Sequence, residues 1–355
     1  MQQPRLRAFD TLRFLAAAQV FVVHANCMSF FLGFLPRALH GLLDGKSAVA
    51  FFFVLSGFVL HFSWKGAWPD QRSWLGFIVK RCLRIYPLYY VSLLLAFVVL
   101  QYLPLSGCPM FHDDASGSLT LQADRHDSRQ WFLHALLVVP GVNQQFLNPP
   151  IWTLVAEMQI SFIFPWLSWL VHRVKGIWGI AAVSLLFALA PWIAARTFGT
   201  LALIPLFVAG ALLAEHRTAV VKIITPVRGG LFLAAGSGCY IASGSFAAGT
   251  EMMRLYVAAA GALMMMVSVL ALPRLRLLLE WRLLAAGGDL SYGLYVLHFP
   301  ILMAAAWVMW KWNLPVPMFV IMSAAVTLGL AFLLYRWLEK PCIMLARRLA
   351  EQMGR

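Results

Sequence analysis

The first apolar segment of the chain carries three ionisable side chains, Asp10, Arg13 and His24, within residues 10–31. Charge is costly in such a segment, so these residues are functional candidates. On a helix, Arg13 and His24 would lie within about 20° of one face and about 16 Å apart along the axis. Asp10 and Arg13, three residues apart, could form an ion pair. An imidazole there suits proton abstraction near neutral pH; a structural stripe with a hydrogen-bonded histidine is the alternative.

A second cluster is basic and lies between two apolar segments. Lys80, Arg81 and Arg84 precede Tyr86 and Pro87. Two arginines three residues apart project from one side of a helical turn, and their guanidinium groups suit phosphate. Ordinary loop charge, or contact with anionic lipid head groups, explains the cluster equally well.

Two later segments also carry polar groups at membrane depth. Glu157 would lie about 9 Å inside a helix beginning at residue 151, where a carboxylate must be paired, protonated or exposed to a cavity. Tyr295 and His298 are three residues apart and share one face of another segment. Taken singly, each of these residues fits a structural role as well as a functional one.

The composition identifies the kind of element that positions these groups. Hydrophobic residues make up 61% of the 355 positions, charged residues only 12%, and the mean hydropathy is +0.78. Soluble domains are usually about 25% charged. The net charge of +14 is spread over short loops rather than over one face, which favours the positive-inside pattern of membrane proteins over nucleic-acid binding. The sequence predicts an all-α polytopic membrane protein.

The predicted fold is a bundle of about ten transmembrane helices in a single domain, residues 1–355, with no appended soluble domain. The first helix is expected to be retained rather than cleaved as a signal peptide, since it carries three ionisable residues. An eleventh apolar run, 131–147, ends in polar residues and is predicted to be re-entrant or to lie on the surface. The expected helices are 10–31, 46–63, 85–103, 151–171, 176–194, 200–214, 229–247, 253–272, 289–311 and 316–338.

Loop charge favours this arrangement. If the segment 131–147 does not cross the membrane and the N-terminus is cytoplasmic, 19 of the 28 Lys and Arg residues lie inside and seven outside. A crossing at 131–147 would invert every later loop and remove most of this asymmetry. We therefore expect both termini in the cytoplasm. Irregular backbone at membrane depth requires cover from protein or a water-filled cavity, so a cavity is expected beside 131–147.

Together the motifs resemble the integral-membrane acyltransferase type 3 family, whose bacterial members O-acylate sugars and other hydroxyl acceptors. The family often has Ser where this chain has Thr153, and both residues supply a hydroxyl. The resemblance covers nearly the whole chain. Its motifs are Phe9 through Arg13 with His24, Phe51 through Phe58 including Ser56, Arg81 through Pro87, Trp152-Thr153-Leu154 with Glu157, Ser291 through His298, and Glu339-Lys340-Pro341.

The resemblance implies a role for each motif residue. His24 is the expected general base, with an acyl-histidine intermediate as the alternative, and Glu157 would orient the imidazole or the acceptor hydroxyl. No metal and no permanently bound cofactor are expected. The expected donor-binding residues are Arg13, Lys80, Arg81, Arg84, Tyr295 and His298, and the expected orienting residues are Asp10, Ser56, Trp152 and Thr153.

The implied co-substrate is cytosolic acyl-CoA, with acetyl the expected acyl group. The implied acceptor is a hydroxyl of a glycan or lipid-linked saccharide at the outer side of a bacterial inner membrane. Membrane lipids are the other expected partners, and nucleic acid is not one. A different class, a transporter or flippase for a glycolipid or small anionic solute, would also place charges and a re-entrant segment in the membrane.

Overall fold

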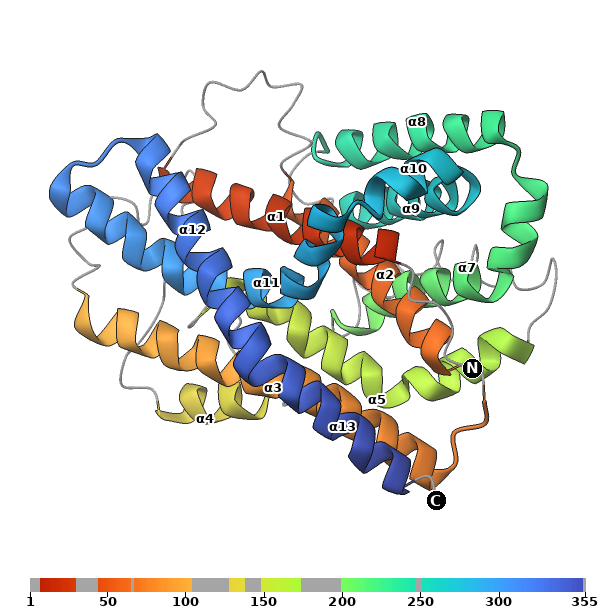
Figure 1. The fold of residues 1–355 in the computed structure, drawn as a ribbon, viewed down its shortest axis with the longest axis horizontal. Helices are drawn as coiled ribbons and strands as arrows, with labels where there is room; N and C mark the ends of the chain where they lie inside the picture. The colour runs from red at the N-terminus through yellow and green to blue at the C-terminus, as the bar shows by residue number, and fades with distance from the viewer. Residues whose placement is uncertain are drawn as a thin grey trace. The chain divides into compact units, whose positions relative to one another are not determined.

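A computed structural model of the protein describes residues 7–29, 44–64, 67–103, 128–137, 148–173, 199–246 and 251–353 (Figure 1). Within these ranges the regular secondary structure is helical. Eight helices in the described residues are long and apolar enough to cross a membrane. The predicted all-α polytopic class is therefore confirmed.

Most helices lie close to their expected ranges, and a few differ. The predicted helix 176–194 lies outside the described residues, as does the second part of the predicted re-entrant segment. A short helix after residue 272 was not expected from the sequence. The elements in chain order are α1 Arg7–Ser29, α2 Gly45–Trp64, α3 Gln71–Tyr102, α4 Ser128–Leu136, η5 Pro149–Ile151, α5 Trp152–Arg173, η6 Leu201–Leu203, α7 Ile204–Ile223, α8 Pro226–Ser243, α9 Glu251–Ala271, α10 Pro273–Leu279, α11 Arg282–Trp312, α12 Val316–Leu334, η7 Tyr335–Glu339 and α13 Lys340–Met353.

Helix α3 begins well before the expected start at residue 85. Asp70 caps its first turn, since Asp70 Oδ1 accepts hydrogen bonds of 3.0 Å from the backbone N–H groups of Arg72 and Ser73. The Ser73 hydroxyl donates to Asp70 Oδ2 at 2.8 Å. These bonds, above all those from Ser73, hold the pKa of the Asp70 carboxyl below its ordinary value. An Asp followed three residues later by Ser is a typical helix start. The sequence analysis missed it because the charged residues that follow were interpreted as a loop.

The basic cluster therefore lies on a helix and not in a loop as expected. Lys80, Arg81 and Arg84 fall in the first half of α3, which continues without a break through Pro87. Proline is favoured in the first turn of a helix, so 85–87 resembles a helix start in the sequence. Inside α3, Pro87 instead removes one backbone hydrogen bond.

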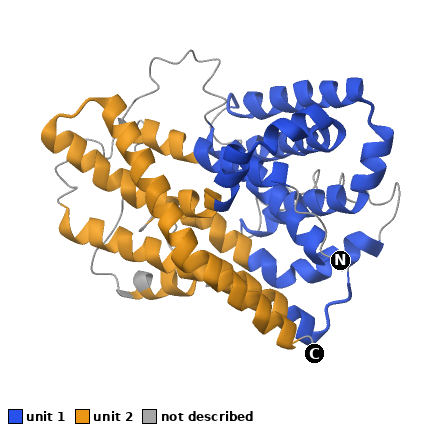
Figure 2. Ribbon diagram, viewed as in Figure 1, with its two compact units in different colours: residues 1–19, 36–74, 159–289 blue, residues 20–35, 75–158, 290–355 orange. Residues whose placement is uncertain are grey.

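The chain divides into two compact units (Figure 2). The first unit comprises residues 1–19, 36–74 and 159–289, and the second comprises residues 20–35, 75–158 and 290–355. The first unit is built largely on packing among α2, α7, α8 and α9. In the second, a core of Leu88, Leu297, Ile301 and Ala331 joins α3, α11 and α12.

Glycines set the spacing of α2 and α7 in the first unit. A Cβ at Gly57 would collide with the backbone carbonyl of Phe207, and a Cβ at Gly210 would collide with the carbonyl of Val54. Each helix thus presents a glycine to the backbone of the other. In lipid, close backbone approach at small residues is a main source of helix association, because apolar side chains gain little by leaving lipid tails.

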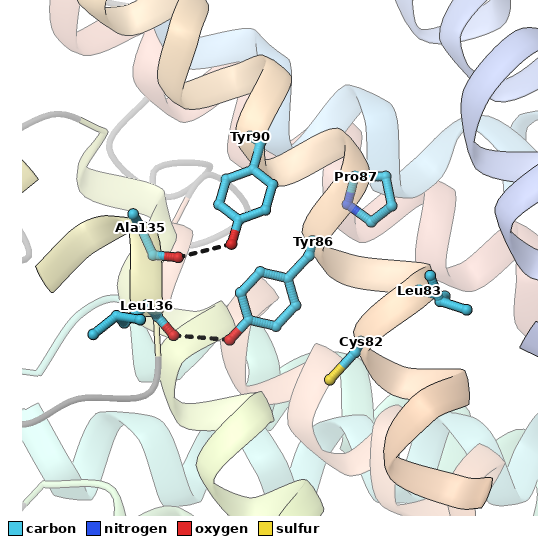
Figure 3. A pocket seen from close by; sticks show the side chains of 7 residues that line it. All are labelled: Cys82, Leu83, Tyr86, Pro87, Tyr90, Ala135 and Leu136. Carbon is cyan, nitrogen blue, oxygen red and sulfur yellow. Dashed lines mark hydrogen bonds between the residues drawn. The ribbon is translucent and has the colours of Figure 1, made fainter. Parts of the chain in front are cut away.

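In the second unit, the described part of the predicted re-entrant segment, 131–137, lies almost entirely in helix α4. This helix has nine residues, far fewer than the roughly 20 that cross a membrane. Its last carbonyls, otherwise without donors, accept hydrogen bonds from tyrosine hydroxyls of α3. Tyr86 donates to Leu136 O at 2.8 Å and Tyr90 to Ala135 O at 3.0 Å (Figure 3). A cavity of about 470 Å³ lies here, between α3 and α4. This hollow is lined by residues of α3 and by Ala135 and Leu136 of α4.

Candidate active site

The second unit brings together two histidines that lie far apart in the sequence. His24 of α1 and His298 of α11 face one another, with 3.0 Å between His24 Nδ1 and His298 Nε2. Their ring centroids are 5.1 Å apart, and their planes are inclined by 30°. At this distance one nitrogen donates a proton and the other accepts it.

The backbone of α11 decides which nitrogen donates. His298 Nδ1 lies 2.7 Å from the carbonyl oxygen of Tyr295 and 3.2 Å from that of Leu294. Carbonyl oxygens only accept, so His298 Nδ1 carries a proton, and in a neutral ring its Nε2 is then an acceptor. His24 Nδ1 must therefore be the donor to His298 Nε2. This leaves His24 Nε2 as the nitrogen with an available lone pair, the atom that a general base uses.

The two rings differ in exposure. His298 is completely buried, whereas His24 is only partly buried. Phe21 and Phe299 present their edges to the pair, with ring centroids 6.3 Å from His298 and 5.5 Å from His24 respectively. Of the two residues, His24 is thus the less buried. His298, expected from the sequence to be a donor-binding residue, is thus in direct contact with His24.

Tyr295 and Thr153, both expected site residues, are in direct contact. The Tyr295 hydroxyl lies 2.7 Å from Thr153 Oγ1 and 2.9 Å from the carbonyl oxygen of Pro150. Both side chains are buried. The contact ties α11 to the turn η5 and the start of α5, and so holds the backbone carbonyl of Tyr295 that fixes the His298 ring.

Asn148 is a residue of this site that the sequence analysis missed. Its side chain is completely buried, and its Nδ2 donates to Ser92 Oγ at 2.9 Å and to the carbonyl of Val296 at 3.1 Å. It therefore joins α3, α11 and the entry to η5. Its position directly before Pro149-Pro150 could have signalled a buried turn, because Asn is typical of turns and helix starts.

Both arginines of the basic cluster are paired with carboxylates. Arg81 forms an ion pair with Glu157 of α5, and Arg84 lies 3.7 Å from Glu339 at the end of η7. The Arg81 side chain is 11% exposed, whereas that of Arg84 is 36% exposed. Arg84 is thus the arginine that can reach a ligand more readily. Glu157 was expected to orient the imidazole or the acceptor, and its observed pairing with Arg81 was not foreseen.

The remaining expected site residues are divided between the two units. Asp10 and Arg13 form the expected pair, with 3.4 Å between Arg13 Nη1 and Asp10 Oδ1, and they lie in the first unit together with Ser56. Lys80 is exposed on α3. Trp152, half-buried, is the first residue of α5.

Residues 6–336 match a family described as "Acyltransferase domain". Over 186 residues the chain is 33% identical to "Acyltransferase MdmB" of Streptomyces mycarofaciens, a match covering 50% of this chain and 43% of that relative. The chain thus aligns with less than half of that relative's length. No solved structure matches.

Proposed function

Because the chain belongs to the integral-membrane acyltransferase type 3 family, we propose that it transfers an acyl group from acyl-CoA to a hydroxyl, with His24 as general base. The observation that carries this proposal is the 3.0 Å hydrogen bond between His24 and His298. That bond orients the His24 ring and leaves Nε2 unprotonated and directed away from its partner. A structural histidine would not need a second, wholly buried histidine to fix its tautomer.

In the proposed step, His24 Nε2 takes the proton of the acceptor hydroxyl as its oxygen attacks the thioester carbonyl carbon. A C–O bond forms, the C–S bond breaks, and the CoA thiolate leaves and recovers the proton from His24. His24 is cationic in between, and its Nδ1–H remains hydrogen-bonded to His298 Nε2. A neutral acceptor behind the ring holds the imidazole in its reactive orientation, as the aspartate does in serine hydrolases.

The donor's phosphates are proposed to bind at the basic cluster of α3. Arg84 is the leading residue because its guanidinium is the more exposed of the two, and planar guanidinium groups suit phosphate oxygens. Lys80, exposed on the same helix, would add charge. Arg81 would contribute through its pair with Glu157. Arg13, which pairs with Asp10, is a further proposed donor-binding residue.

We propose an acetyl donor, a glycan or lipid-linked saccharide acceptor at the outer side, and a bacterial inner membrane with both termini in the cytoplasm. The family resemblance supports the acceptor class, and the loop-charge asymmetry supports the orientation.

Thiol release from acetyl-CoA by the full-length protein in nanodiscs, with and without a glycan extract, tests this function. We expect acceptor-dependent release, reduced at least about 10²-fold in His24→Ala. Arg84→Gln should raise the KM for acetyl-CoA with a smaller change in kcat. The His216→Ala variant, on α7 of the first unit, serves as a histidine control and should retain wild-type rates.

Two other outcomes would redirect the proposal. Retention of radiolabelled acetyl on the protein before acceptor is added, dependent on His24, would favour the acyl-histidine route. Folded protein that binds no acyl-CoA and releases no thiol would contradict the acyltransferase assignment, and substrate movement across the bilayer would then identify a transporter.

A further inference from the structure

The helix at the C-terminal end of the protein is interrupted by one π-helical turn. This turn, η7, covers Tyr335–Glu339 between α12 and α13, and the N–H of Lys340 donates to the carbonyl of Tyr335 five residues earlier. Pro341 provides the cause. It has no N–H for the carbonyl of Trp337, and its ring crowds that carbonyl, so the preceding turn widens.

The widened turn delivers a carboxylate to the interior. Glu339, the last residue of η7, is 1% exposed, although its neighbour Lys340 is exposed. A buried carboxylate requires a positive partner. That partner is Arg84, whose Nη1 lies 3.7 Å from Glu339 Oε1. Single π turns inside helices occur frequently at functional sites.

The backbone beside Arg84 is fixed from another direction. Tyr292 of α11 donates its hydroxyl to the carbonyl of Ile85, the next residue, at 2.6 Å. The helix backbone and one edge of the guanidinium are thus both held. The Arg84 side chain thus forms an ion pair with a buried carboxylate while remaining 36% exposed itself. A group held in this way is pre-organised to bind an anion.

We propose that Glu339 is a positioning residue that fixes the Arg84 guanidinium for the nucleotide phosphates of the acyl-CoA donor. This inference rests on the proposed function. In this proposal Glu339 does not contact the donor but holds Arg84, which does. The π turn caused by Pro341 places Glu339 next to Arg84. This gives a physical explanation for the Glu-Lys-Pro sequence at 339–341. Pro341 widens the turn, and the widened turn places the Glu339 carboxylate next to Arg84.

The test compares two donors, acetyl-CoA and acetyl-pantetheine, which carries the same thioester but no nucleotide phosphates. In the full-length protein in nanodiscs, Glu339→Gln should raise the KM for acetyl-CoA about 10-fold, equivalent to about 1.4 kcal/mol. It should leave kcat and the KM for acetyl-pantetheine nearly unchanged. The double variant Arg84→Gln/Glu339→Gln should be no worse than Arg84→Gln alone, because both act through one contact.

Matched variants exclude a general loss of structure. Glu351→Gln removes an exposed carboxylate from α13 and should change neither KM. Glu339→Asp keeps the charge and should restore part of the acetyl-CoA affinity, which also serves if Glu339→Gln fails to fold. Equal KM increases for both donors, or additive effects of the two substitutions, would overturn the inference while leaving the acyltransferase intact. A wild-type protein that uses neither donor would instead contradict the proposed function and remove this inference with it.

Discussion

At the residue scale, the proposed catalysis by His24 depends on one proton whose position is set by backbone carbonyls. The carbonyls of Tyr295 and Leu294 place a proton on His298 Nδ1, which makes His298 Nε2 an acceptor and His24 Nδ1 a donor. Two neutral imidazoles can share this single proton, whereas two imidazolium rings would face each other with like charges and opposed N–H groups. The pair therefore favours a neutral, correctly oriented His24, the form that a general base requires.

Removing His298 should weaken catalysis without weakening donor binding. We expect His298→Gly to lower kcat by about 10²-fold, since His24 loses its orientation and fixed tautomer, with the KM for acetyl-CoA unchanged. Exogenous imidazole should restore part of the rate by occupying the vacated space. Steady-state thiol release measures both effects. An unchanged kcat, or a loss confined to KM, would show that His298 does not support His24.

At the element scale, helix α11 holds the site together. Three of its residues, spaced by three, each contact a different element. Tyr292 donates to the backbone of α3 at Ile85, Tyr295 to Pro150 of η5, and His298 contacts His24 of α1. One helix face thus contacts α3 next to Arg84, the turn before α5 and His24. A small change in the rotation of α11 would disturb all three contacts at once.

The first unit relies on a different device, the glycine contact between α2 and α7. Gly210→Ala should lower the free energy of unfolding by about 1–3 kcal/mol. The new Cβ would collide with the carbonyl of Val54, so the two helices must separate. Gly238→Ala on α8 is the control: nothing lies within 4 Å of its added Cβ, so stability should be unchanged or slightly increased. Thermal unfolding in detergent compares them. Equal stability of the two variants would show that α2 and α7 tolerate wider spacing.

At the scale of the whole molecule, the hydropathy pattern predicted the helices better than the positions of charged residues predicted the loops. Hydropathy indicated the helical class and most of the helix ranges. Ionisable residues within apolar segments indicated His24 as a candidate site residue. The expectation of a loop at Arg81 and Arg84 was wrong because their partners, Glu157 and Glu339, are remote in sequence and allow the charges to lie on a helix. The partner of His24 could not be derived from spacing, since 274 residues separate it from His298.

The orientation of the whole chain remains a prediction that follows from charge. With 19 Lys and Arg residues on one side and seven on the other, the positive-inside rule places both termini in the cytoplasm. Green fluorescent protein fused after residue 355 should fluoresce, and alkaline phosphatase fused there should be inactive. Fusions after Trp312, in the short connection between α11 and α12, should give the opposite pattern. The reverse result at both positions would show that the protein has the opposite orientation. The basic cluster of α3 would then lie outside, which would exclude cytosolic acyl-CoA as its ligand.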